Sequence, residues 1–89
     1  MKAIITVVGN DKVGIIAKVS NILAENNINI LDISQTIMQN MFTMIMLVDV
    51  SGIKVNFNEI SKILDNLGKE LDLSIKIQHE NIFNSMHRI

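Results

Sequence analysis

The 89-residue sequence contains no cysteine, no proline, no tryptophan and no tyrosine. Without cysteine the chain can form neither a disulfide scaffold nor a zinc ribbon, and it has no thiol nucleophile. Its three aromatic residues are all phenylalanines, which are too few for the stacking platforms that bind single-stranded RNA. With no proline and only four glycines, no linker is evident, so the structural elements are expected to follow one another closely.

No charge of either sign dominates. Eight Lys and Arg residues against nine Asp and Glu residues give a net charge of −1, so the chain lacks the basic field that attracts nucleic acid directly. Its longest uncharged stretch, between Asp32 and Asp49, is too rich in Ser, Thr, Asn and Gln to span a membrane. The N-terminal residues lead directly into an apolar strand pattern and lack the features of a signal peptide. We therefore expect a cytoplasmic protein with neither nucleic acid nor a membrane as a direct partner.

The proportions of apolar and charged residues are those of a folded chain. Apolar residues make up 48% and charged residues 19%, which argues against disorder, and 89 residues are enough for one domain. The mean hydropathy of +0.34 is high for so small a domain. We therefore expect part of its apolar surface to be covered by a partner.

The hydrophobic pattern predicts four strands of two kinds. Two are almost continuously apolar, as expected of strands buried on both faces, and two alternate apolar with polar residues, as expected of sheet edges. Gln39 and Asn40 predict a hairpin turn between the second strand and the third. The doubly apolar strands are residues 2–8 and 41–50, and the alternating strands are residues 28–38 and 73–78.

Helical spacing of apolar residues predicts two helices. The first runs from about Val13 to Asn26, and Asp11 is expected to be its N-cap. The second begins at Asn56, where Glu59 three residues later completes a capping-box pattern. Its buried face is expected to consist of Phe57, Ile60, Ile63, Leu64, Leu67 and Leu71.

Two consecutive strand–helix–strand units predict an α+β fold. We expect a ferredoxin-like βαββαβ sandwich, with a four-stranded antiparallel sheet of order 4-1-3-2 and both helices on one face. The central strands would be the two that are apolar on both faces, with Ile4 and Val8 on one face and Ile5 and Val7 on the other, so the helix-free face also needs cover. A second copy of the chain is expected to supply part of that cover, as a homodimer or a higher homo-oligomer. The alternative is a monomer sealed by the tail, whose Ile82, Phe83, Met86 and Ile89 have helical spacing.

The most informative segment is residues 9–15, Gly-Asn-Asp-Lys-Val-Gly-Ile, between the first strand and the first helix. Gly9 is expected to turn the backbone at the end of the strand. Gly14 is expected in the first helical turn, where glycine costs ~1 kcal/mol relative to alanine. A helix N-terminus binds carboxylates, and Asp11 beside it could hold an amine. The segment therefore suits a zwitterionic amino acid, although an ordinary capped turn accounts for the same residues.

The βαββαβ order, the 9–15 segment and the Asn-Ile pair at residues 29–30 resemble an ACT domain. The resemblance covers about residues 1–80, and residues 81–89 form a C-terminal tail that is expected to be helical and packed on the domain or on a partner. The chain is similar to the small stand-alone ACT proteins of bacteria and archaea. The resemblance implies a regulatory module that is not an enzyme, has no cofactor and binds a small ligand, often an amino acid, between paired domains.

The resemblance also implies which residues contact the ligand. One copy supplies the turn between its first strand and first helix, and the facing copy supplies the start of its second strand. Val13 stands where the family often has proline, which makes the turn less rigid here. Carried over to this chain, the ligand-binding residues are Asn10, Asp11, Lys12, Val13, Gly14, Ile15 and, from the facing copy, Asn29.

The remaining polar residues favour no other chemistry. His79 and His87 are more typical of surface residues than of metal ligands. No Ser-His-Asp set and no carboxylate pair suggests catalysis, and the single arginine, Arg88, lies in the tail and not in a loop that could cradle a phosphate. The clustered Met38, Met41, Met44 and Met46 are typical of adaptable packing. The alternative to a ligand-binding module is a protein-interaction or oligomerisation module without a metabolite.

Overall fold

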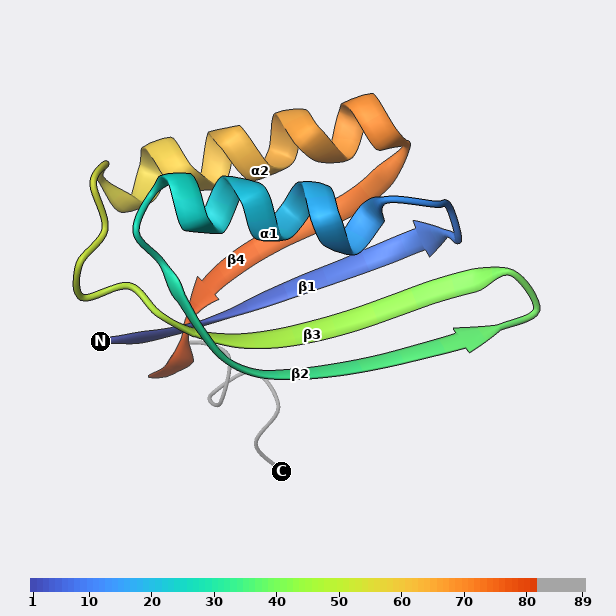
Figure 1. The fold of residues 1–89 in the computed structure, drawn as a ribbon, viewed down its shortest axis with the longest axis horizontal. Coiled ribbons are helices and arrows are strands. Elements are labelled where there is room, and N and C mark those ends of the chain that lie inside the picture. Colours follow the sequence, from blue (N-terminus) through green and yellow to red (C-terminus); the bar gives the residue numbers. More distant parts are fainter. Residues whose placement is uncertain (82–89) are drawn as a thin grey trace.

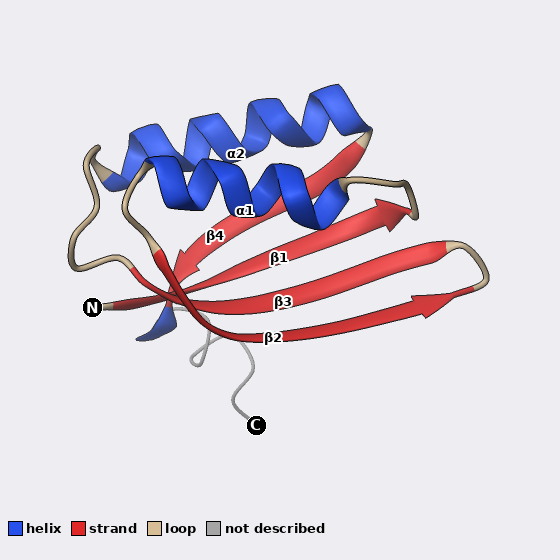
Figure 2. Cartoon of the chain, in the orientation of Figure 1, coloured by secondary structure: helices blue, strands red, loops and turns tan. Residues whose placement is uncertain are grey.

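The computed structural model describes residues 1–81. The strands form one antiparallel sheet in the order β2-β3-β1-β4, and both helices lie on one side of it (Figure 1 and Figure 2). The predicted ferredoxin-like fold and its strand order are therefore confirmed. Apart from Asn81, the predicted helical tail lies outside the described residues. The elements are β1 (Lys2–Asn10), α1 (Ile15–Glu25), β2 (Asn29–Met38), β3 (Met41–Asp49), α2 (Phe57–Leu71) and β4 (Leu73–His79).

The core lies between the sheet and the two helices, and it follows from the alternation of side chains along the strands. On β1, Ile5 and Val7 are completely buried, while Val8 on the opposite face is 37% exposed. On β3, Met44 and Met46 are likewise completely buried, while Ile45 between them is 39% exposed. The two central strands are thus apolar on both faces, as predicted, and the helix-free face carries exposed apolar side chains.

The start of α2 confirms the predicted capping arrangement. The Asn56 side-chain oxygen accepts a hydrogen bond from the Glu59 backbone N–H at 2.8 Å, and the Asn56 amide donates to the Glu59 carboxylate at 3.0 Å. Glu59 also places a negative charge in the first turn, where the helix dipole favours it. The predicted apolar stripe faces the sheet, with Ile60 and Leu64 completely buried.

The start of α1 differs from the prediction. The helix begins at Ile15, its N-cap is Gly14 and not Asp11, and no side chain caps it. Gly14 has φ 91°, in the left-handed region that favours glycine, so this residue precedes the helix and does not weaken its first turn. Asp11 is held elsewhere, because its backbone N–H donates to the Asn40 carbonyl at 2.8 Å.

Gly9 also differs from its predicted role. It lies inside β1, paired with Leu73, and the strand continues to Asn10. A Cβ atom at residue 9 would lie 3.2 Å from the Leu73 Cα and 3.3 Å from the Asp72 carbonyl oxygen. Glycine is therefore needed here for the close approach of the turn that opens β4, and not to end the strand.

The hairpin between β2 and β3 forms where it was predicted. Gln39 has φ 51° and Asn40 has φ 69°, and two successive positive φ values give the turn whose twist suits a two-residue hairpin. The turn pairs Met38 with Met41. Because Asn10 pairs with Met41 and Asp11 bonds to Asn40, the hairpin tip lies beside the turn that leads into α1.

The two edge strands differ in how well they are protected against pairing with a strand of another molecule. β4 has seven residues and carries Lys76, and a charged side chain of this kind discourages pairing with another strand. β2 has ten residues, nine of them exposed, and its one charged residue, Asp32, and its bulge lie near the start of the strand. Its side chains on the helix side include Ile33 and Ile37, which are 41% and 56% exposed. The edge at β2 is therefore the one suited to association.

Candidate functional site

A cleft of about 470 Å³ lies between the start of α1 and the edge strand β2. Its volume is in the range of clefts that hold small molecules. Its walls are mainly apolar, and its charged residues come from the segment between β1 and α1. The lining residues are Asp11, Lys12, Gly14, Ile15, Ile16, Ala17, Gln35, Ile37 and Phe42.

The N-terminus of α1 borders this cleft without a side-chain cap. The first backbone hydrogen bond of α1 runs from the Lys18 N–H to the Gly14 carbonyl. The backbone N–H groups of the three residues before Lys18 therefore have no acceptor within the helix. These residues are Ile15, Ile16 and Ala17, and all three line the cleft. The cleft thus has the hydrogen-bond donors and the dipole that favour an anion such as a carboxylate.

Asp11 supplies a negative charge at the same cleft. Its backbone is tied to the hairpin tip through Asn40, which fixes the position of the residue relative to β2 and β3. The carboxylate forms no hydrogen bond or ion pair with any other residue in the described part of the chain. It is therefore available to a cation, and the cleft offers opposite charges to the two ends of a zwitterion.

Lys12 has a structural partner. Its ammonium donates a hydrogen bond to the backbone carbonyl of Leu71, the last residue of α2. A cation at the carbonyl end of a helix is stabilised by the helix dipole. Lys12 therefore links the segment between β1 and α1 to the end of α2.

We expect Lys12→Met to lower the free energy of unfolding by about 1 kcal/mol, because methionine keeps an apolar stem but loses the ammonium at the end of α2. Urea unfolding followed by circular dichroism measures this change. Lys18→Met is the control, since the Lys18 ammonium lies 3.9 Å from the Glu70 carboxylate in an exposed pair that contributes less. Equal losses in the two variants would contradict a capping role for Lys12.

The structure brings four of the seven predicted ligand-binding residues together at the cleft, namely Asp11, Lys12, Gly14 and Ile15. Asn10 ends β1, and Val13 is fully exposed in the turn; neither lines the cleft. Asn29 opens β2 and pairs with Asp49, at the opposite end of the sheet from the hairpin tip. Within one copy, Asn29 is therefore remote from the cleft, and its predicted role requires a second copy.

Five lining residues were not predicted: Ile16, Ala17, Gln35, Ile37 and Phe42. The predicted hairpin turn could have located some of these residues. A two-residue turn at Gln39 and Asn40 places Ile37 opposite Phe42, and alternation then places Gln35 on the same face. What the pattern could not show is that α1 stops short of covering β2.

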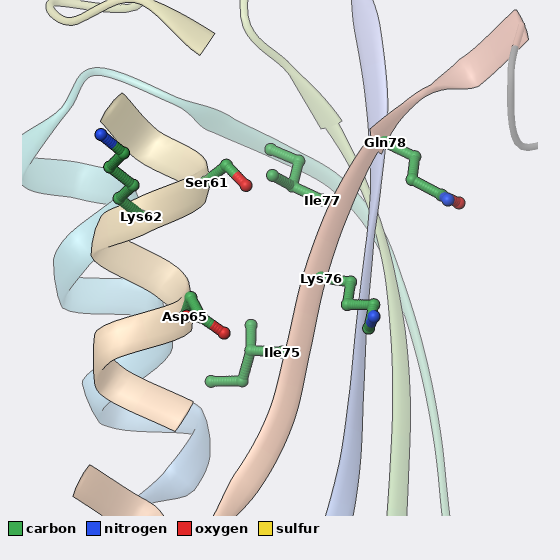
Figure 3. Close-up of a pocket in the computed structure, with 7 residues that line it drawn as sticks. All are labelled: Ser61, Lys62, Asp65, Ile75, Lys76, Ile77 and Gln78. Atoms are coloured by element: carbon green, nitrogen blue, oxygen red, sulfur yellow. The ribbon is translucent and has the colours of Figure 1, made fainter. Parts of the chain in front are cut away.

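A second, smaller cleft of about 300 Å³ lies between α2 and β4 (Figure 3). Ser61 and Asp65 extend from the helix toward β4, while Lys76 and Gln78 point away from the helix (Figure 3). None of the predicted ligand-binding residues lines it. The first cleft is therefore the candidate site.

Two other titratable residues, His79 and Asp49, make contacts within the fold. The His79 ring stacks on Phe57 at 4.0 Å between centroids. Hydrogen bonds from the Ser51 hydroxyl and backbone N–H lower the pKa of Asp49, at the end of the sheet remote from the cleft. Within residues 1–81, no three His, Asp or Glu side chains gather as metal ligands would, and no helix is long and apolar enough to cross a membrane.

Comparison with known proteins identifies the family. The family model described as the ACT domain matches residues 2–78, which is most of the chain. The chain belongs to the ACT domain family. ACT domains are commonly regulatory and bind small ligands.

The relatives of this ACT domain are small proteins of bacteria and archaea. It is 67% identical to a UPF0237 protein from Clostridium acetobutylicum, over the full length of both chains. It is 54% identical to one from Methanocaldococcus jannaschii, covering 99% of this chain and 98% of the relative. Among solved structures, an ACT domain protein from Streptococcus pneumoniae matches with a TM-score of 0.81 and 47% identity, covering 93% of each chain.

Proposed function

We propose that this ACT domain is a non-catalytic regulatory module that binds an amino acid in the cleft between α1 and β2, at the interface of two copies. The observation that carries the proposal is the meeting of an uncapped helix N-terminus and the unpaired Asp11 carboxylate in one largely apolar cleft. The helix N–H groups suit the α-carboxylate, and Asp11 suits the α-ammonium. The apolar walls, including Ile16 and Ile37, suit the remainder of the ligand.

The second copy completes the site through β2. When two edge strands pair in antiparallel fashion about a two-fold axis, the start of each strand lies beside the end of the other. The end of β2 adjoins the turn that contains Asp11, because the hairpin tip bonds to that turn. Pairing along β2 therefore carries Asn29 of the second copy toward the cleft, across a strand length of about 30 Å.

The proposal is tested by screening the twenty amino acids with isothermal calorimetry. We expect one or a few to bind, and we expect Asp11→Ala to weaken that binding roughly tenfold to a hundredfold, because the α-ammonium loses a charge-assisted partner. Asp65→Ala is the matched control, since it removes the same charged group from the exposed face of α2. Binding that survives in Asp11→Ala, or that fails equally in Asp65→Ala, would rule out the proposed site.

The exposed β2 edge also favours a second candidate, an interaction module without a metabolite. Native mass spectrometry distinguishes the two. A dimer that carries the added mass of an amino acid supports the ligand-binding module. The interaction module is supported if the dimer shows no added mass and calorimetry detects no binding of any of the twenty amino acids.

A further inference from the structure

Gln35 interrupts an otherwise apolar row on the helix side of β2. It pairs with Met44, while its neighbours in the row, Ile33 and Ile37, pair with Met46 and Phe42. These three β3 side chains are at most 3% exposed and belong to the core beneath the helices. Directly opposite residues in a sheet point to the same face, so Gln35 faces the helix side with the two isoleucines. Gln35 is therefore the one polar side chain among the three residues of this row.

Gln35 lines the candidate cleft, and the charged residues of the cleft come from a different part of the chain. Gln35 comes from β2, whereas Asp11 and the N–H groups of α1 come from the opposite wall. The side chain forms no hydrogen bond with another residue in the described part of the chain. It therefore offers two donors and an acceptor beside the apolar surfaces of Ile16 and Ile37.

We propose that Gln35 determines the specificity of the cleft and that the ligand is an amino acid with an uncharged polar side chain. This inference rests on the proposed function. With the α-ammonium at Asp11 and the α-carboxylate at the start of α1, the ligand side chain extends toward β2. An aliphatic side chain there would cover the Gln35 amide and leave it unpaired, while a hydroxyl or carboxamide would hydrogen-bond to it.

Two pairs of amino acids with matched shapes test the inference by calorimetry on the full chain: threonine against valine, and asparagine against leucine. For the wild-type protein we expect the polar member of at least one pair to bind roughly tenfold more tightly or better. Gln35→Leu keeps a side chain of similar size without the amide, and it is expected to remove or reverse that preference. The exposed position of Gln35 means that the variant should fold, which circular dichroism checks.

Thr36→Val is the matched control. It removes a polar group from the neighbouring residue of the same strand, on the opposite face of the sheet. The preference for the polar ligand is expected to survive in this variant. Loss of the preference in Thr36→Val as well as in Gln35→Leu would overturn the inference, because the effect would then belong to the strand and not to the Gln35 amide.

The remaining outcomes separate the inference from the function on which it rests. Tighter binding of valine or leucine by the wild-type protein, or an unchanged preference in Gln35→Leu, overturns the role of Gln35 and leaves the amino-acid site standing. If Gln35→Leu changes only the dimerisation constant, the inference is wrong and Gln35 belongs to the contact between copies. Absence of binding for all twenty amino acids overturns the proposed function and the inference together.

Discussion

Replacing Ile33 with lysine is expected to weaken the association of two ACT domains by about a hundredfold or more. Ile33 is 41% exposed on the helix side of β2, the longer and less protected sheet edge. In a pair of copies joined along β2, this side chain lies close to the contact, and an ammonium there loses hydration without gaining a partner. Removing a charge from water without compensation costs several kcal/mol, which corresponds to at least two orders of magnitude in a dissociation constant.

Sedimentation equilibrium over a range of protein concentrations measures this effect. Ser74→Lys is the matched control, because it adds the same charge to the opposite edge strand, β4, at an exposed position. We expect the wild-type protein and Ser74→Lys to be dimers, and Ile33→Lys to be a monomer at micromolar concentration. Dissociation of Ser74→Lys alone would place the contact at β4, and a wild-type monomer would remove the two-copy site altogether.

Ile5→Ala is expected to lower the free energy of unfolding by about 2–5 kcal/mol. Ile5 is completely buried at the centre of β1, between β3 and β4, and it faces the core. The substitution removes three carbon atoms from this core and leaves a cavity that the surrounding strands cannot close. A domain of this size has only about 5–15 kcal/mol of stability, so this loss removes a substantial fraction of it.

The control for Ile5→Ala is the same chemical change on the other face of the sheet. Ile45 lies on β3, which pairs with β1, but its side chain is 39% exposed on the helix-free face. We expect Ile45→Ala to lose less than half as much stability in urea unfolding at one fixed protein concentration. An equal loss in the two variants would contradict the one-sided core and would show that the helix-free face is buried in solution.

The pattern of residues predicted the fold because the fold depends on local and repeating features. Strands that are continuously apolar were predicted to be central, and strands that alternate apolar with polar residues were predicted to be edges. The capping pair Asn56 and Glu59 located the start of α2. Gln39 and Asn40 located the hairpin, since few residues adopt two successive positive φ values. Each of these signals lies within a few residues of the structure that it specifies.

The start of α1 shows where such signals are insufficient. Asp11 has the side chain of a good N-cap, and the spacing of apolar residues supported a helix from about Val13. The Asp11 N–H instead bonds to Asn40, about thirty residues away in the sequence, and the helix begins at Ile15, after Gly14 with its positive φ. A cap preference is worth ~1 kcal/mol, which a tertiary hydrogen bond and its packing can outweigh.

The sequence by itself determined the order of the elements, the topology of the sheet, the two-sided apolar character of β1 and β3, and the turn segment that contributes Asp11 and Gly14 to the candidate site. Only the tertiary structure showed that Gln35 and Ile37 face that segment across one cleft, that Lys12 turns toward the end of α2, and that Asn29 lies at the far end of the sheet. The physical reason is the distance along the sequence over which the deciding interactions act. Strand and helix periodicity is set by neighbouring residues, whereas a cleft is set by how far a helix reaches across a sheet, which depends on the packing of the whole chain.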